Sequence, residues 1–522
     1  MVNKANRQNL IKDCKEEFNL YYDEILQKVR KICSDKLGIG MDEIAASSSF
    51  SNDLLCDSLT SLEIVMALES ELDLMLDNIE YTNKYSVEDI AKQIYYKKYG
   101  RELHSEHHKG KDIIPVSLFE NSREYMELTA KKKALGDVEL PYFIPHDSVV
   151  RDTSIINGKE VLNFGSYNYL GLSGHPITVK AAKDAAEKYG TSSSGSRILA
   201  GEKSLYIELE REIANWKHAD DAIVLVSGNA TNTTVIGNLC NDNDLIMYDS
   251  LSHNSIIQGC KLSDATARSF PHNDFKTLDL LLEKNRKYYE KVLIVIEGVY
   301  SMDGDIAPVK DFVYIKKKHQ CFLMVDEAHS SCVIGERGNG VDEYFGLMPN
   351  DIDIKMGTLS KGVGTCGGYI AGSYSLIDYL KYCIPGFVFA AGISPILAAS
   401  SLEAIKHIRK DNTLVKQLHE SIKYFLKVAH HKGFDTGLAK ESAIVPIIIG
   451  DEGLACELSN QMLQKGVFVP PAIYPAVPMG EARLRFCLTS MHRPEQIDQA
   501  IDILFNLIKE NTYQLTRLKN VV

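Results

Sequence analysis

Short apolar segments separated by longer amphipathic stretches constrain the fold of this chain more than any other feature. Three of them, 222–226, 292–296 and 322–325, are rich in apolar and β-branched residues, and each is followed by small or acidic residues. Such segments are typical of strands that are buried on both faces of a parallel sheet and joined by helices. The sequence therefore predicts an α/β domain with a mainly parallel sheet over about 141–515. Sheets of this kind bind ligands at the carboxyl ends of their strands.

The residues that follow these segments suit a cofactor. The tripeptide Ser227-Gly228-Asn229 opens a predicted helix whose free N–H groups favour a phosphate, although ordinary strand-to-helix connections look the same. Asp326 directly follows the third segment, where a carboxylate either pairs with a protonated pyridine nitrogen or caps the next element. His329 lies three residues further on, and it either faces the same site or makes a structural hydrogen bond.

Lys361 lies among small residues in the segment Gly357–Thr365. Glycines beside a lysine let a planar ligand approach the backbone closely. A desolvated lysine has a lowered pKa and forms a Schiff base with an aldehyde. The alternatives are a lysine on an ordinary glycine-rich loop or a phosphate-binding loop, but the Gly-Lys-Ser/Thr order of the latter is absent.

The N-terminal region is different in character. Apolar spacing predicts helices over 21–37, 58–72 and 87–99. Between Met41 and Glu80 there are ten acidic residues and no Lys or Arg, which predicts an acidic face that attracts basic patches on partner proteins. The residues 100–140 are predicted to be a linker that begins with a polar stretch and becomes partly helical.

Length and composition narrow the remaining possibilities. With 522 residues the chain is too long for a single hydrophobic core. We expect no transmembrane segment and no secretory signal, and therefore a cytoplasmic protein. The 11 cysteines contain no Cys-x-x-Cys pair, so we predict reduced, mostly buried thiols and no metal site. The net charge of -12 gives no support for nucleic-acid binding.

Ser58 stands at the predicted start of the second N-terminal helix, where a serine commonly serves only as a cap. The order Asp57-Ser58-Leu59, with Phe50 upstream and an acidic helix downstream, nevertheless resembles acyl carrier proteins over about 17–99. The resemblance implies that Ser58 carries a 4′-phosphopantetheine arm, attached by a phosphopantetheinyl transferase and charged by an acyl-loading enzyme. Leu55 departs from the pattern, since these carriers usually have glycine there.

The order of the strand ends and the lysine resembles fold-type I enzymes that use pyridoxal 5′-phosphate (PLP), and within them the α-oxoamine synthase family. The resemblance runs from about Val161 to Leu507, and it implies a smaller C-terminal α+β domain. Segments that match in order are Asn163–Leu172, Gly195–Arg197, Leu251–Ser255, Glu297–Gly304 and Ala482–Arg485.

The resemblance also implies roles for individual residues around PLP. Lys361 forms the internal aldimine, Asp326 binds the pyridine nitrogen, His329 contacts the ring hydroxyl and His253 stacks on the ring, which makes these four the catalytic candidates. The remaining implied ligands of the cofactor are Gly228, Asn229 and Thr358 near the phosphate and Ser301 near the ring. Asn229 departs from the pattern, because several relatives have an aromatic residue there.

Arg485 is implied to receive the carboxylate of an amino acid, a role that suits the fork of a guanidinium group. In isolation a surface ion pair explains Arg485 equally well. The predicted reaction is a decarboxylative condensation of an amino acid with an acyl thioester, giving an α-aminoketone. Two alternatives stay open, a fold-type I aminotransferase or aldol-cleaving enzyme and a non-catalytic carrier scaffold. By analogy with the family we expect a homodimer.

Overall fold

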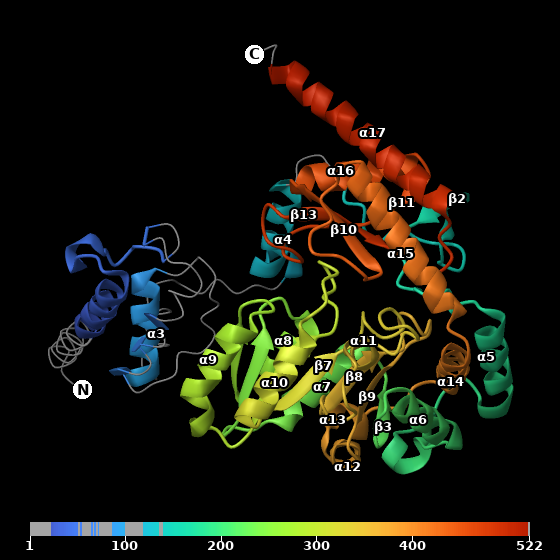
Figure 1. The fold of residues 1–522 in the computed structure, drawn as a ribbon, viewed down its shortest axis with the longest axis horizontal. Helices are drawn as coiled ribbons and strands as arrows, with labels where there is room; N and C mark the ends of the chain where they lie inside the picture. Colours follow the sequence, from blue (N-terminus) through green and yellow to red (C-terminus); the bar gives the residue numbers. More distant parts are fainter. Residues whose placement is uncertain are drawn as a thin grey trace. The chain divides into compact units, whose positions relative to one another are not determined.

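The computed structural model describes residues 22–50, 53–54, 64–65, 67–68, 71–72, 86–99, 118–134 and 139–519. The chain separates into two compact units, which are considered one at a time. Figure 1 shows the elements of each unit, with colours that follow the sequence. Within the described part of the chain, no helix combines the length and the apolar character that a membrane span requires.

The N-terminal part of the chain is mainly helical in the residues that the structure describes. Residues 22–37 form a helix, η1 spans Met41–Glu43 and α3 spans Val87–Tyr99. The described residues between 58 and 72 are also helical, so the three predicted helices are confirmed there. Ser58 and Leu55 themselves lie outside the described residues. One apolar core joins these segments, and its fully buried members include Val29, Ile64, Leu68 and Ile94.

Residues 118–134 include two short helical elements, η3 over Phe119–Asn121 and α4 over Arg123–Ala134. The expected helical part of the stretch before residue 140 is thereby confirmed. The polar beginning of the predicted linker falls outside the described residues, so its role as a linker stays a prediction.

A seven-stranded sheet forms the centre of the large unit, in the order β3-β9-β8-β7-β6-β4-β5. Strands β4, β6, β7 and β8 pair in parallel, whereas β9 runs antiparallel to both β3 and β8. The mainly parallel sheet is therefore confirmed, and the three predicted strands agree within one residue at each end. The bounds are β3 Asp221–Leu225, β4 Leu245–Asp249, β5 Thr266–Phe270, β6 Val292–Glu297, β7 Phe322–Asp326, β8 Ile354–Thr358 and β9 Gly368–Gly372.

Helices surround this sheet because its strands are apolar on both faces. Helix α7 packs against α8 and strands β3, β8 and β9, while α10 packs against β7 and α6 against β3. The helices and helical turns are α5 Pro176–Tyr189, η4 Arg197–Gly201, α6 Ser204–Trp216, α7 Gly228–Leu239, α8 Asn254–Leu262, α9 Phe275–Asn285, η5 Arg286–Tyr288, α10 Val309–His319, α11 Val341–Phe345, α12 Tyr374–Cys383, α13 Pro385–Val388 and α14 Pro395–Lys410.

The predicted smaller α+β part is also present. A three-stranded sheet of order β10-β13-β12 packs against α16, and a second sheet has the order β1-β2-β11. Figure 1 shows α15, α16 and α17 grouped around β10 and β13. The bounds are β1 Thr153–Ile156, β2 Lys159–Asn163, α15 Thr413–His431, β10 Ile444–Gly450, α16 Glu452–Gln464, β11 Val467–Phe468, β12 Pro471–Ala472, β13 Ala482–Cys487 and α17 Pro494–Lys519.

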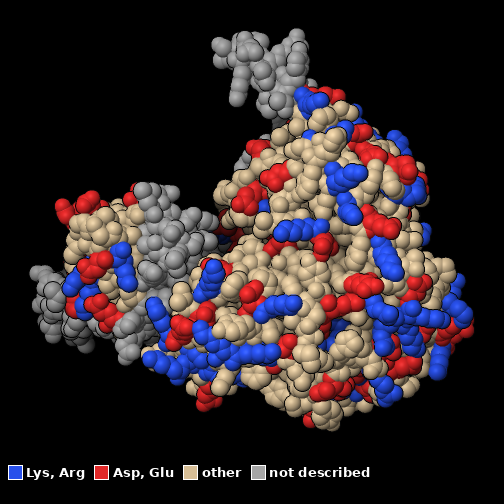
Figure 2. All heavy atoms as spheres, in the orientation of Figure 1, with Lys and Arg blue, Asp and Glu red and all other residues tan. Residues whose placement is uncertain are grey.

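Charged side chains of both signs are interspersed over the face of the large unit seen in Figure 2. Ion pairs at the surface of this unit include Lys318 with Glu283 and Lys432 with Asp502. Exposed pairs of this kind contribute little to the free energy of unfolding. The ionic interactions that matter for the site are buried.

Candidate active site

The carboxyl edge of the parallel sheet gathers most of the predicted site residues. Asp326 ends β7 and Thr358 ends β8, while Gly228 begins α7 after β3 and His253 caps α8 after β4. Because parallel strands end at the same edge, residues far apart in sequence meet there. Ser58 lies outside the described residues.

Lys361 lies in the turn that follows β8. Its Nζ is 2.6 Å from Nε2 of His329, whose Nδ1 lies 2.7 Å from the hydroxyl of Tyr169. The neighbouring glycines serve the protein itself, since a Cβ on Gly362 would lie 2.3 Å from the Cβ of Cys332. The small residues around Lys361 therefore reflect close packing of its loop against the chain, which sets the direction of the lysine side chain.

Burial changes the chemistry of the Lys361 amine. Removal from water lowers its pKa from 10.5 to about 8, with the negative charge of Asp326 opposing the shift and the positive charge of Arg485 adding to it. With a pKa of about 8, roughly one amine in ten is neutral at pH 7, far more than for an exposed lysine. A neutral amine is the form that attacks an aldehyde.

Asp326 is 4% exposed and has hydrogen bonds to both carboxylate oxygens. Asn232 Nδ2 donates to Oδ2 over 2.7 Å, and the main-chain N–H of Ala328 donates to Oδ1 over 2.8 Å. The bond to Ala328 shows that Asp326 does stabilise the following turn, as the capping alternative proposed. A buried carboxylate held by two donors also suits a partner for a protonated ring nitrogen.

His253 lies at the start of α8 with an exposed side chain. Its Nδ1 accepts a hydrogen bond from the main-chain N–H of Ser255, and its own main-chain N–H donates to Glu297. Desolvation lowers the pKa of His253, although Asp326 opposes the shift. The imidazole is therefore neutral at physiological pH and presents an uncharged ring toward the site.

The residues predicted near a phosphate occupy the start of α7 and the end of β8. A Cβ on Gly228 would lie 3.0 Å from both Cβ and Oγ1 of Thr358, so glycine permits the close approach of these two segments. Asn229 is exposed in the first turn of α7. The hydroxyl of Thr358 already donates to the carbonyl of Gly367 over 2.9 Å. The hydroxyl of Ser227 caps α7 by accepting the main-chain N–H of Ala230 over 3.1 Å, and the start of such a helix suits a phosphate.

Arg485 projects from β13 into the same region and is 4% exposed. Its Nε donates to the carbonyl of Ser301 over 2.6 Å, and its Nη1 lies 3.0 Å from Sγ of Cys487. Nη2 is buried and has no hydrogen-bond partner within the described chain. The surface ion pair considered for Arg485 is therefore wrong. The unused donor of a buried guanidinium group fits a carboxylate that arrives with the substrate.

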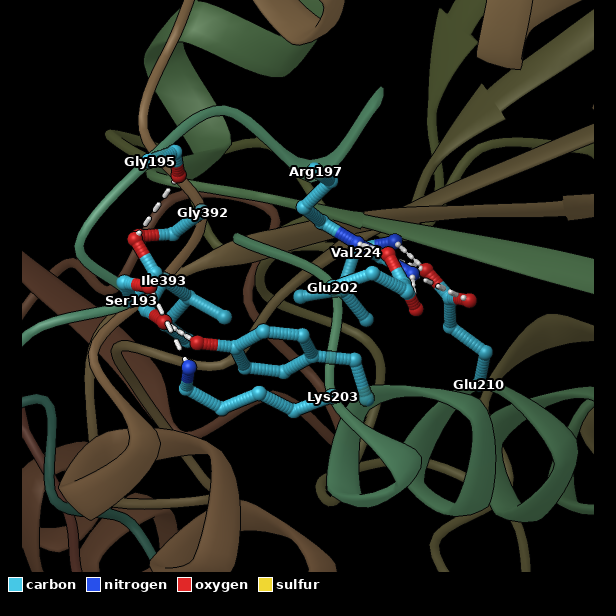
Figure 3. Close-up of polar contacts among 10 residues, drawn as sticks. Ser193, Gly195, Arg197, Glu202, Lys203, Glu210, Val224, Gly392 and Ile393 are labelled. Carbon is cyan, nitrogen blue, oxygen red and sulfur yellow. Dashed lines mark hydrogen bonds and ion pairs between the residues drawn. The ribbon is translucent and has the colours of Figure 1, made fainter. Parts of the chain in front are cut away.

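Arg197 has a structural role, although it belongs to a segment that matches the family. Figure 3 shows its guanidinium group between Glu202 and Glu210, to which it donates hydrogen bonds. Glu210 also accepts the main-chain N–H of Val224 over 2.9 Å. Since Glu202 and Glu210 both accept hydrogen bonds from its guanidinium group, Arg197 anchors η4 to α6 and β3.

A second buried ion pair fixes the loop that carries Asp326 and His329. Lys217 Nζ lies 2.8 Å from Glu327 Oε1, and both side chains are 0% exposed. Glu327 also accepts the main-chain N–H of Val341 over 2.9 Å. Because Glu327 follows Asp326 directly, this pair holds the end of β7 in place.

Several residues of the site were not predicted from the sequence. The ring of Tyr167 lies beside both cations, with its centroid 5.7 Å from Lys361 Nζ and 5.0 Å from Arg485 Cζ. Asn232 forms a hydrogen bond with Asp326, and Tyr169 forms one with His329. The two tyrosines belong to a segment that matched the family, which was the available signal. Asn232 belongs to the segment 227–232 that was expected to open a helix near the phosphate, but no role was predicted for its side chain.

Comparisons with known proteins agree with this geometry. Residues 159–504 match the family described as "Aminotransferase class I and II", and residues 27–94 match "Phosphopantetheine attachment site". The 8-amino-7-oxononanoate synthase of Symbiobacterium thermophilum is 40% identical over 351 residues, which cover 67% of this chain and 89% of the relative. The 8-amino-7-oxononanoate synthase 1 of Bacillus subtilis is 38% identical over 355 residues, covering 68% and 90%.

Solved structures show the same relationship. A serine palmitoyltransferase from S. paucimobilis with a bound PLP-myriocin aldimine aligns with a TM-score of 0.71 at 32% identity, covering 73% of this chain and 97% of that one. The 8-amino-7-oxononanoate synthase from Francisella tularensis aligns with a TM-score of 0.59 at 26% identity, covering 67% and 99%.

The chain belongs to the α-oxoamine synthase family. It is a PLP-dependent acyltransferase of that type and carries a phosphopantetheine attachment domain at its N-terminal end. This membership favours condensation over the aminotransferase, aldol-cleaving and scaffold alternatives. The residues present fit the cofactor, since the buried Asp326 suits its ring nitrogen, the amine of Lys361 suits its aldehyde and the first turn of α7 suits its phosphate.

The pKa of Lys361 makes a prediction about cofactor capture. The rate at which full-length apoprotein takes up PLP should rise with pH and level off above about 8, because the neutral amine reacts. Stopped-flow absorbance measures this rate. In Asp326→Asn the midpoint should move to lower pH, since the charge that raises the pKa is lost. A wild-type midpoint near 10.5, the ordinary lysine value, would contradict the assignment.

Proposed function

We propose that this enzyme condenses an amino acid with an acyl thioester carried on its own N-terminal domain. The observation that carries the proposal is the buried Nη2 of Arg485, which lacks a hydrogen-bond partner in the described chain beside the amine of Lys361. A site that holds a carboxylate next to a reactive amine is suited to an amino acid. The products are carbon dioxide, an α-aminoketone and the free thiol of the carrier arm.

The residues that would surround the cofactor have different roles. Bound PLP withdraws electrons from the α-carbon of the amino acid, and it would be held by Lys361, Asp326, His329 and the start of α7. Lys361 Nζ accepts the α-proton, which its lowered pKa favours in the neutral form. Asp326 would pair with the ring nitrogen of the bound cofactor, and the neutral His253 would lie against the ring without adding charge.

Arg485 orients the amino acid. Its guanidinium group is fixed by the carbonyl of Ser301 and by Cys487, and its Nη2 remains for the substrate carboxylate. The Tyr167 ring between Arg485 and Lys361 keeps the carboxylate and the α-amino group at separate ends of the site. This arrangement selects for molecules that carry both groups.

The fused carrier is the proposed acyl donor. A phosphopantetheine arm on Ser58 holds the acyl group as a thioester, after a phosphopantetheinyl transferase and an acyl-loading enzyme have acted. Joining donor and enzyme in one chain raises the local donor concentration to roughly the millimolar range for a short flexible linker. Tethering therefore favours the carrier-bound donor over free acyl-CoA.

The carrier role predicts the behaviour of Ser58→Ala. With the acyl group supplied only through the loaded carrier, this variant should lose at least about 100-fold in amino-acid-dependent release of carbon dioxide. Labelled carboxylate in the amino acid measures the release, and intact mass confirms loading. Ser61→Ala, in the same predicted helix, is the control and should retain wild-type rates. If Ser58→Ala matched the wild type under these conditions, the carrier would not be the donor.

The role of Arg485 predicts a defect in substrate affinity. Arg485→Gln should raise the KM for the amino acid about 10- to 100-fold, because a charge-assisted bond to the carboxylate is lost. Steady-state kinetics at saturating acyl donor measures the change. Arg493→Gln, at an exposed position, should leave KM unchanged. An unaltered KM in Arg485→Gln would exclude Arg485 as the carboxylate ligand.

We also infer that the enzyme is a homodimer. Leu199 and Phe389 are 83% and 86% exposed, and they lie on neighbouring segments joined by a bridge between Ser196 and Ala391. Large apolar side chains that are this exposed and close together are typical of an interface. A second copy of the chain is the partner that the family relationship favours.

The dimer can be tested by mass in solution. Sedimentation equilibrium should give twice 58.3 kDa for the wild type and 58.3 kDa for Phe389→Asp, because the new charge would be buried in the interface. Leu438→Asp is the control, because Leu438 is 62% exposed but lies in a different segment of the chain. This variant should remain dimeric. A monomeric wild type, or a dimeric Phe389→Asp, would contradict the inference.

A further inference from the structure

A chain of hydrogen bonds connects Asp326 to His253 through two buried side chains. Asn232 Nδ2 lies 2.7 Å from Asp326 Oδ2 and 2.9 Å from Ser255 Oγ. Ser255 Oγ in turn lies 2.7 Å from His253 Nδ1. Both linking residues are 1% exposed. Asp326, predicted to bind the ring nitrogen, and His253, predicted to stack on the ring, are therefore linked by hydrogen bonds inside the protein.

The direction of each bond follows from the donors available. A carboxylate only accepts, so the amide nitrogen of Asn232 must face Asp326, and its second N–H points to Ser255 Oγ. The Ser255 hydroxyl is then free to donate to His253 Nδ1, and its main-chain N–H reaches the same atom over 3.2 Å. Because Nδ1 accepts, neutral His253 carries its proton on Nε2.

Helix packing creates this chain. Asn232 lies in α7 and Ser255 in the first turn of α8, and the two helices pack against each other. Gly259 makes the approach possible, since a Cβ there would lie 2.8 Å from Cβ of Ile236 and 3.0 Å from the carbonyl oxygen of Asn232. The link is therefore a consequence of how closely α7 and α8 come together.

We propose that Asn232 and Ser255 are positioning residues that hold the Asp326 carboxylate and the His253 imidazole in one fixed arrangement, with His253 protonated on Nε2. The charged groups that face His253 are Asp326 and Lys361, and the carboxyl of Glu297 accepts its main-chain N–H. The proposal rests on the proposed cofactor site and adds Asn232 and Ser255, which act by holding Asp326 and His253 in place. Neither residue needs to touch the substrate.

The experiment measures His253 in full-length apoprotein. Diethyl pyrocarbonate modifies the unprotonated imidazole, and peptide mapping against pH gives the midpoint for His253 alone. Ser255→Ala should move this midpoint upward by up to about one pH unit, because a donor that favours the neutral ring is lost. Asn232→Leu should shift it in the same direction by less, since the Ser255 hydroxyl is then free to turn away.

Two further variants separate positioning from general damage. Ser255→Thr retains the hydroxyl and should restore the wild-type midpoint. Ser459→Ala removes another buried serine, whose hydroxyl donates to the carbonyl of Val469 over 2.7 Å, and should leave the midpoint unchanged. Thermal denaturation confirms that each variant is folded. A folded Ser255→Ala with the wild-type midpoint would overturn the proposal, and if that variant does not fold, an unshifted Asn232→Leu would do so.

Cofactor affinity gives a second readout that does not depend on turnover. Asn232→Leu should weaken PLP binding about tenfold, because Asp326 loses the donor that orients it. Asn285→Leu, which removes a buried amide that bonds to the carbonyl of Leu281, is the matched control. Since neither measurement uses an acyl donor, failure of the proposed condensation would leave this inference standing.

Discussion

The site depends on one carboxylate, that of Asp326, which is buried inside the protein. Burying such a group is costly unless donors and opposite charge surround it. Asn232 and the main chain of Ala328 supply the donors, and the amine of Lys361 supplies charge nearby. The same carboxylate raises the pKa values of its neighbours, opposing the effect of burial on Lys361 and His253. Its position is secured in turn by the buried pair between Lys217 and the next residue, Glu327.

Much of this arrangement was predictable because strand ends converge. The apolar segments that form β3, β6 and β7 were predicted within one residue, and Asp326 lies at the end of β7 as expected. Lys361 lies in the turn after β8, a strand that the sequence analysis did not predict. The contacts that the sequence did not predict arise from packing between helices and strands. Asn232 reaches Asp326 only because α7 and α8 lie close together, and Tyr169 reaches His329 from 160 residues away. The glycine beside Lys361 also has a packing role that was not predicted, since Gly362 fits against Cys332.

The chain combines two kinds of specificity. The site built from Arg485, Tyr167 and Lys361 is proposed to recognise the amino acid through its carboxylate and amine. Recognition of the acyl group is proposed to begin earlier, when the carrier is loaded, so that the condensing site receives a donor already selected. An acidic carrier segment with no Lys or Arg between Met41 and Glu80 suits docking to basic surfaces of the loading enzymes.

Covalent capture of the cofactor by one amine is the claim on which the enzymatic account rests. Borohydride reduction of PLP-saturated protein, followed by digestion and mass spectrometry, tests it directly. The account predicts a single modified peptide that contains Lys361 with the reduced cofactor on its side chain. An unmodified Lys361 in saturated protein, or the cofactor on another lysine, would contradict it.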